Sequence, residues 1–136
     1  MAVAEIPAFA ATGPFPDSVD GVRLHRLGEH TCVLSVGADL RRVATGALEE
    51  AAATAASRGC TDFVFDLGPL RSYEAGSLRR LADLWRRLAV LDCGVFVAAS
   101  TLSLTADLRR LPAQDAWTLA PSVAEALRAL LARPVE

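Results

Sequence analysis

Two short segments that are apolar at every position constrain the fold of this chain more than any other feature. Residues 63–65 (Phe-Val-Phe) and 95–99 (Val-Phe-Val-Ala-Ala) lack the alternation of polar and apolar side chains that a half-exposed strand shows. Such runs are typical of strands covered on both faces, as in parallel sheets with helices on either side. The sequence therefore predicts an α/β fold with residues 63–65 as its central strand.

The first half of the chain shows further elements around this strand. Residues 22–27 and 31–36 flank Gly28-Glu29-His30, as expected for two antiparallel strands joined by a hairpin. An alanine-rich helix is predicted from Thr45, as its N-cap, to about Ser57, with Gly59 ending it.

The second half adds helices between strands. Leucine and tryptophan recur at three- and four-residue steps over residues 77–91, which predicts an amphipathic helix. Residues 104–111 read as a short helix, residues 117–119 as a short edge strand, and Ser122 as the N-cap of a last helix. The element order predicts a mixed sheet of four to five strands packed against about four helices.

The domain organisation follows from where this pattern begins. Residues 1–20 contain Pro7, Pro14 and Pro16 and no periodicity, so we expect a loose arm that Phe9 and Phe15 could pin to the domain. We expect residues 21–133 to form a single domain. No apolar run is long enough to cross a bilayer, and the first residues lack the pattern of a signal peptide, so the expected location is the cytoplasm.

Charge and cysteine content exclude several classes of partner and cofactor. The formal net charge is −2, from 14 arginines, no lysine and 16 acidic residues, which gives no general attraction to nucleic acid or to an anionic membrane. Cys32, Cys60 and Cys93 lack the close pairing of zinc or redox motifs, and we expect them to be buried small apolar residues of a reduced protein. We expect no cofactor and no metal ion.

Catalytic motifs do not stand out in the sequence. It contains no glycine-rich phosphate loop ending in lysine, no His-Glu-x-x-His and no Gly-x-Ser-x-Gly. A nucleophile made of Cys32 and His30 would lie near the first hairpin, but His25 and His30 are more simply surface histidines. We therefore predict that the protein is not an enzyme.

Residues 66–78 carry the clearest functional signal, because they connect the central strand to the amphipathic helix. Small residues at such a turn leave backbone N–H groups exposed at the helix N-terminus, where an anion or an acidic side chain of a partner can bind. An ordinary tight loop would have the same composition, so both interpretations stay open at this point.

With this segment the chain resembles the STAS family, whose fold is that of the bacterial anti-sigma-factor antagonists. The resemblance extends from about Val22 to Leu131. In that family an Asp-Leu ends the central strand and an Asp-Ser-Ser/Thr-Gly-Leu turn opens the next helix. Counted from Asp66-Leu67, that turn falls on residues 74–78, which are Glu-Ala-Gly-Ser-Leu. A second family motif, Gly-Glu-Leu-Asp, falls on residues 38–41, and the typical ending Ser-Val-Ala-Glu-Ala-Leu is present as residues 122–127.

The departures from the family pattern change what the resemblance implies. The family's regulatory serine, which a partner kinase phosphorylates, corresponds to Ala75, which has no hydroxyl. Only Ser72 or Ser77 could then accept a phosphate, and Ser77 is more simply a helix cap. Arg41 replaces an acidic family residue, which implies weak binding of a standard anti-sigma kinase and an altered partner.

The resemblance implies a protein-binding regulatory module of bacterial transcription and signalling, with an anti-sigma factor or a serine kinase as its partner. The residues expected to bind this partner are Asp39, Arg41, Ser72, Tyr73, Glu74, Ala75, Gly76 and Ser77. A STAS module that binds a small ligand or nucleotide, or a subunit of a transport system, is the alternative. Four arginines of the helix at residues 77–91 should lie on roughly one side, facing solvent, an acidic partner or a phosphate backbone: Arg79, Arg80, Arg86 and Arg87.

Overall fold

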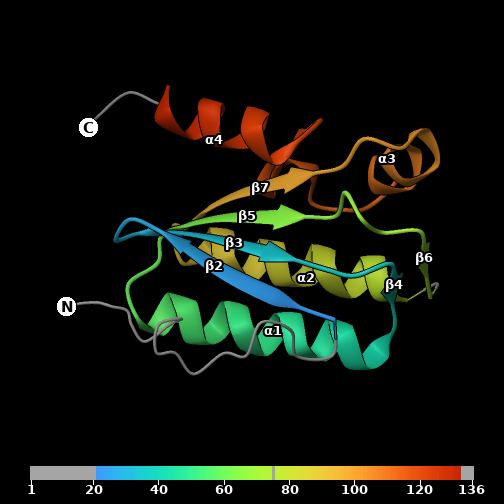
Figure 1. Ribbon diagram of the computed structural model, residues 1–136, viewed down its shortest axis with the longest axis horizontal. Coiled ribbons are helices and arrows are strands. Elements are labelled where there is room, and N and C mark those ends of the chain that lie inside the picture. The colour runs from blue at the N-terminus through green and yellow to red at the C-terminus, as the bar shows by residue number, and fades with distance from the viewer. Residues whose placement is uncertain (1–20, 75, 133–136) are drawn as a thin grey trace.

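The computed structural model describes residues 21–74 and 76–132, and its centre is a mixed β-sheet of five strands in the order β2-β3-β5-β7-β8 (Figure 1). The first pair, β2 and β3, is antiparallel and all other pairs are parallel. The strands are β2 (Arg23–Leu27), β3 (Thr31–Ser35), β5 (Asp62–Asp66), β7 (Gly94–Ala98) and β8 (Thr118–Ala120). The predicted mixed sheet, its hairpin and its central strand are confirmed.

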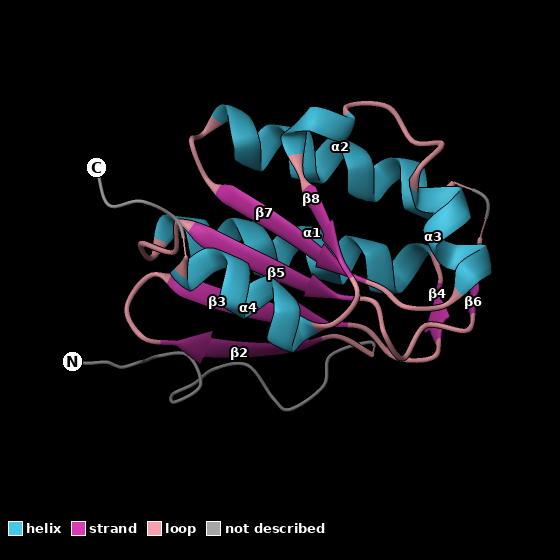
Figure 2. Cartoon of the chain, turned by 90° about the horizontal axis from the view of Figure 1, so that it is seen from above, coloured by secondary structure: helices cyan, strands magenta, loops and turns pink. Residues whose placement is uncertain are grey.

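Helices cover the sheet on both faces. Helices α1 (Arg42–Ser57) and α2 (Ser77–Val90) lie on one face and α4 (Val123–Leu131) on the other, as Figures 1 and 2 show from two directions. The short helix α3 (Leu102–Leu108) lies beyond the carboxyl end of β7, and a 3₁₀ turn, η1 (Gln114–Ala116), leads into β8. This arrangement explains why the three middle residues of β5 and of β7 are apolar and buried.

The central strand belongs to two separate apolar layers. Phe63 and Phe65 pack with the core under α1 and α2, whereas Val64 packs with the smaller cluster under α4, and all three side chains are fully buried. The larger layer contains an aromatic series in which the ring centroids of Phe65 and Trp85 lie 5.8 Å apart and those of Trp85 and Trp117 4.8 Å apart. Trp85 therefore connects α2 to both the central strand and the chain leading into β8.

A second, two-stranded sheet was not predicted. It pairs β4 (Asp39–Leu40) with β6 (Ser72–Tyr73) in parallel. Elements of two residues are too short to show any periodicity, so the sequence pattern does not predict either strand. Their pairing positions the candidate site.

The ends of the helices partly follow the prediction. Gly59, at φ +100, follows α1, and the Ser122 hydroxyl of α4 accepts a hydrogen bond from the Glu125 N–H, both as expected. The predicted cap at Thr45 is wrong. Helix α1 starts at Arg42, three residues earlier, so Thr45 lies inside the helix, buried, with its hydroxyl donating to the Arg41 carbonyl.

The expectation of three free thiols is also corrected. Cys32 and Cys60 are buried as predicted, but they are joined by a disulfide with their Cα atoms 6.4 Å apart. The parallel pairing of β3 with β5 places Cys32 opposite Phe63. This brings Cys32 into contact with Cys60, which precedes β5 and lies 28 positions further along the chain. Cys93 is free and half-buried, and burial, followed by the charges of Asp62 and Asp92, raises its thiol pKa.

The described residues offer neither a membrane-spanning helix nor a metal-binding cluster. No helix among residues 21–74 and 76–132 has the length and hydropathy that crossing a bilayer requires. The same residues contain no group of three or more histidine, cysteine or acidic side chains that could hold a metal ion. Residues 1–20, including Phe9 and Phe15, and residue 133 lie outside the described residues.

Candidate functional site

The pairing of β4 with β6 brings together the two segments that the sequence indicated as one binding surface. Asp39 lies opposite Ser72 and Leu40 opposite Tyr73 in the register. The backbone N–H of Glu74 donates to the Leu40 carbonyl at 3.1 Å, which extends the contact beyond the strands. Of the predicted site residues only Ala75 lies outside the described part of the chain.

Glu74 connects this surface to helix α1. Its Oε1 atom accepts a hydrogen bond of 2.8 Å from the backbone N–H of Arg42, the first residue of α1. A carboxylate at this position satisfies one of the N–H groups that a helix leaves unpaired and interacts favourably with the helix dipole. Glu74 therefore supplies the capping group that the Arg41 side chain does not provide.

Two hydroxyl groups of β6 are also engaged. The exposed Ser72 hydroxyl donates to Asp39 Oδ1, across the two-stranded sheet. The Tyr73 hydroxyl donates to Asp107 Oδ2 of α3. That hydrogen bond, together with partial burial and the negative charge of Asp107, raises the pKa of Tyr73 to about 12. Tyr73 is therefore a neutral donor at physiological pH and joins β6 to α3.

Ser77 and Gly76 differ from the expectation. Ser77 is not the N-cap of α2: it is the first residue of the helix, 3% exposed, and its hydroxyl donates to the Leu40 carbonyl at 3.2 Å. The N-cap is Gly76, which is exposed, has φ −84 and offers open space where a Cβ atom would lie. Gly76 therefore leaves the start of α2 uncovered by any side chain of its own.

The surface contains a shallow concavity of about 210 Å³ lined by Arg41, Ser72, Tyr73 and Glu74. Pockets that enclose a small molecule are typically larger, roughly 300–1,000 Å³, and mostly apolar. A small polar hollow on an exposed surface is better suited to a side chain of a protein partner. The sequence pattern missed Asp107, because a residue of a different helix carries no signal of its contact with Tyr73.

The four arginines of α2 do not form one free face. Arg80 Nη2 lies 2.6 Å from Glu49 Oε1 of α1, and Arg87 Nη2 lies 3.7 Å from Glu49 Oε2. Arg86 pairs with Asp83 of its own helix, and Arg79 is exposed near the start of α2. The ion pairs of Arg80 and Arg87 therefore hold α1 against α2.

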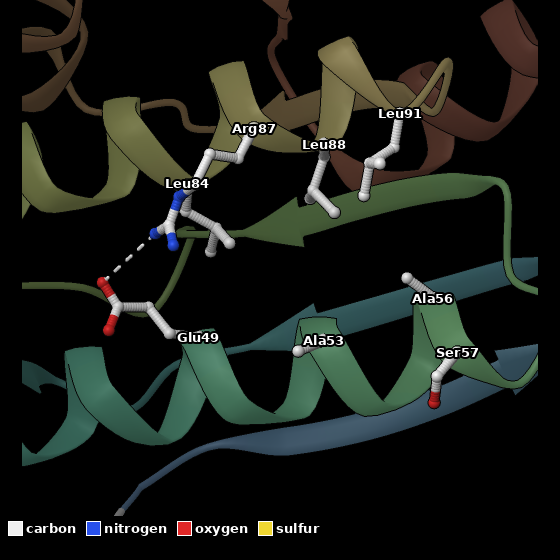
Figure 3. A pocket seen from close by; sticks show the side chains of 8 residues that line it. All are labelled: Glu49, Ala53, Ala56, Ser57, Leu84, Arg87, Leu88 and Leu91. Carbon is white, nitrogen blue, oxygen red and sulfur yellow. Dashed lines mark ion pairs between the residues drawn. The ribbon is translucent and has the colours of Figure 1, made fainter.

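The same two helices border a groove of about 410 Å³ (Figure 3). Small side chains on α1, Ala53 and Ala56, face Leu84, Leu88 and Leu91 of the α2 side, which leaves an apolar depression. Glu49 and Arg87 form its polar end, joined by the ion pair drawn in Figure 3.

The alternative of a Cys-His nucleophile is not supported by the geometry. The Cys32 sulfur is buried in the disulfide, which leaves no thiol to attack a substrate. His30 lies in the turn before β3, is exposed, and has its Nδ1 3.1 Å from the Gly59 carbonyl oxygen.

Comparison with solved structures shows which known fold this arrangement matches. The structure of the anti-sigma factor antagonist SpoIIAA in its unphosphorylated form superposes with a TM-score of 0.66 at 14% identity, over 82% of this chain and 99% of the other. The chain has a STAS-like fold. The structure of the Bacillus cell fate determinant SpoIIAA in the phosphorylated form gives a TM-score of 0.65 at 13% identity, over 80% of this chain and 98% of the other.

A third STAS-like structure shows the same agreement. An anti-sigma factor antagonist from Mycobacterium paratuberculosis gives a TM-score of 0.62 at 22% identity, over 81% of this chain and 92% of the other. At these identities the likeness concerns the fold. No family model and no curated protein sequence matches the chain.

Proposed function

We propose that this chain is a protein-binding regulatory module of the anti-sigma-factor antagonist type, acting in the cytoplasm of a bacterium in the control of transcription. The observation that carries the proposal is the β4–β6 pairing, which brings Asp39, Arg41, the segment Ser72–Glu74, Gly76 and Ser77 to the start of α1 and α2. Binding is then the whole function, and no catalytic step is needed. We call the exposed residues of this region the docking surface: Asp39, Arg41, Ser72, Glu74 and Gly76.

The proposal includes the absence of the usual phosphorylation switch. Ala75 has no hydroxyl, and Ser77 is buried with its hydroxyl bonded to Leu40, so neither offers an accessible acceptor. Ser72 is exposed, but a phosphate there would lie beside the carboxylate of Asp39, where like charges repel. The module therefore remains competent to bind at all times.

Restoring the serine tests this part of the proposal. Ala75→Ser and wild-type protein are used side by side to capture partners from the native cytosol, then incubated with ATP and weighed intact. We expect both to capture the same kinase-like partner and only Ala75→Ser to gain a phosphate, because it alone has a hydroxyl at that position. Ala124→Ser, on the far helix α4, is the matched control and should gain none. Phosphate on the wild-type protein would contradict the absence of a switch, and capture of no kinase by either protein would count against this type of partner.

The alternative, a small-ligand module, has one observation in its favour, the groove between α1 and α2. Its apolar wall suits the chain of a fatty acid such as decanoate, whose carboxylate would compete with that of Glu49 for Arg87. A ligand that binds only the folded state raises the melting temperature by mass action. Stabilisation by decanoate that is lost when Ala53→Trp fills the groove would favour this function, and no shift would leave protein docking as the better account.

A further inference from the structure

The segments that form the docking surface carry more positive than negative side chains, although the chain as a whole has a net charge of −2. Four exposed arginines lie on the segments that form this surface: Arg41, Arg42, Arg71 and Arg79. None of their guanidinium groups has an ion-pair or hydrogen-bond partner within the described part of the chain. Asp39 and Glu74 lie on the same segments and Asp107 of α3 contacts Tyr73, so these groups still leave a positive formal charge, opposite in sign to that of the whole molecule.

The carboxylates of Asp39 and Glu74 already accept hydrogen bonds, which lowers their contribution to the charge of the surface. Asp39 accepts the hydrogen bond of the Ser72 hydroxyl, and Glu74 accepts that of the Arg42 backbone N–H at the start of α1. Part of each negative charge is thus compensated within the surface itself. The four arginines have no such compensation from the residues that the structure describes, so they are available to carboxylates of a partner.

The backbone contacts of the region hold these arginines at one end of the molecule. Arg41 lines the concavity together with Ser72 and Glu74. The backbone N–H of Arg71 donates to the Ala38 carbonyl at 2.7 Å, and Arg79 lies in the first turn of α2, two residues after the buried Ser77. Figure 1 shows β4, β6 and the first turns of α1 and α2 together at this end.

One large apolar side chain is exposed among the charges. Val43, in the first turn of α1 beside Arg42, is 63% exposed. Binding surfaces commonly combine a few anchoring contacts with charges that orient the partner. Val43 can therefore supply an apolar contact at the edge of the positive region.

We propose that this surface binds an acidic segment of a protein partner, with Arg41 and Arg71 pairing its carboxylates and an apolar side chain of the partner packing on Val43. The inference rests on the proposed docking function and specifies the chemistry of the partner. Arginine forms two parallel hydrogen bonds with a carboxylate, which gives such contacts direction as well as charge. A nucleic acid fits less well, because the chain as a whole is negative and its one tyrosine is already bonded to Asp107.

A labelled deca-glutamate peptide is the probe for this proposal, measured by fluorescence anisotropy against wild-type protein. We expect binding that weakens as salt rises from about 50 to about 300 mM, since the distance over which exposed charges interact shortens with rising salt and is about 8 Å at about 0.15 M. The double variant Arg41→Glu/Arg71→Glu should bind at least about tenfold more weakly, because it replaces two attractive charges by repulsive ones. Deca-glutamine should not bind.

The matched control is Arg58→Glu/Arg128→Glu, which changes the net charge by the same amount at the end of α1 and on α4. It should bind deca-glutamate as wild type does, within about twofold, if the local surface rather than the overall charge is responsible. Equal loss in both double variants would overturn the proposal. So would tighter binding of a ten-nucleotide oligothymidine than of the peptide.

The same variants separate this inference from the docking function on which it rests. Applied to the partner captured in the Ala75→Ser experiment, Arg41→Glu/Arg71→Glu should reduce capture at least about tenfold. If Arg41→Glu/Arg71→Glu captures the partner as well as wild type does, but Gly76→Glu does not capture it, the proposal of an acidic partner is wrong and the docking surface stands. If both variants capture the partner as well as wild type does, the docking surface itself is wrong.

Discussion

Replacing Gly76 by glutamate is expected to abolish capture of the protein partner, with a loss of at least about a hundredfold in affinity, while the fold remains intact. The loss follows because Gly76 is exposed at the start of α2 and is part of the docking surface, where a long acidic side chain would obstruct contact and repel an acidic partner. The fold should tolerate the change, because the position has φ −84 and open space for a Cβ atom. Capture is quantified by pull-down and stability by urea denaturation.

The control for this experiment is Ala124→Glu, which places the same side chain in the first turn of α4, on the opposite face of the sheet. It should capture the partner as wild type does. The free energy of unfolding of both variants should lie within about 1 kcal/mol of the wild-type value, as is usual for surface substitutions. Undiminished capture by Gly76→Glu would move the docking surface away from the β4–β6 region.

Replacing Trp85 by alanine is expected to lower the free energy of unfolding by about 3–5 kcal/mol, as removal of a large buried aromatic side chain does. Trp85 is fully buried, and its ring lies between those of Phe65 on the central strand and Trp117 before β8. The cavity left behind would remove contacts between three parts of the core at once. Urea denaturation monitored by far-UV circular dichroism measures the change.

The neighbouring residue provides the control for Trp85. Arg86 is exposed on the same helix and pairs with Asp83 one turn away. Arg86→Ala should therefore alter the free energy of unfolding by no more than about 0.5 kcal/mol. A loss below about 1 kcal/mol in Trp85→Ala would show that the aromatic series is not a main contributor to the core.

Much of the fold was readable from local patterning. The run of apolar residues at 63–65 indicated a strand covered on both faces, and it is the central strand. The leucine periodicity of residues 77–91 predicted α2, and the Ser122-x-x-Glu125 spacing predicted the cap of α4. Each of these signals depends on residues within a few positions of one another, which is the range over which helix and strand periodicity acts.

The resemblance to the STAS family indicated the residues of the candidate site but not their contacts. Ser77 read as a helix cap, because a serine before an amphipathic run is usually one. It is buried instead, because the Leu40 carbonyl, 37 positions away in sequence, lies within reach of its hydroxyl. The Cys32–Cys60 disulfide was missed for the same reason, since their proximity arises only when β3 pairs with β5.

The chain's local sequence was thus sufficient for the five strands of the main sheet, for the presence of its helices and for the layers they form, because an amphipathic or apolar segment must bury its apolar side chains. The docking surface required the assembled fold. Glu74 meets α1 across 32 positions and Ser72 meets Asp39 across 33, through a pair of two-residue strands with no periodicity of their own. Contacts of that range form only when the main sheet brings both loops to the same end of the molecule, and no pattern along the chain records them.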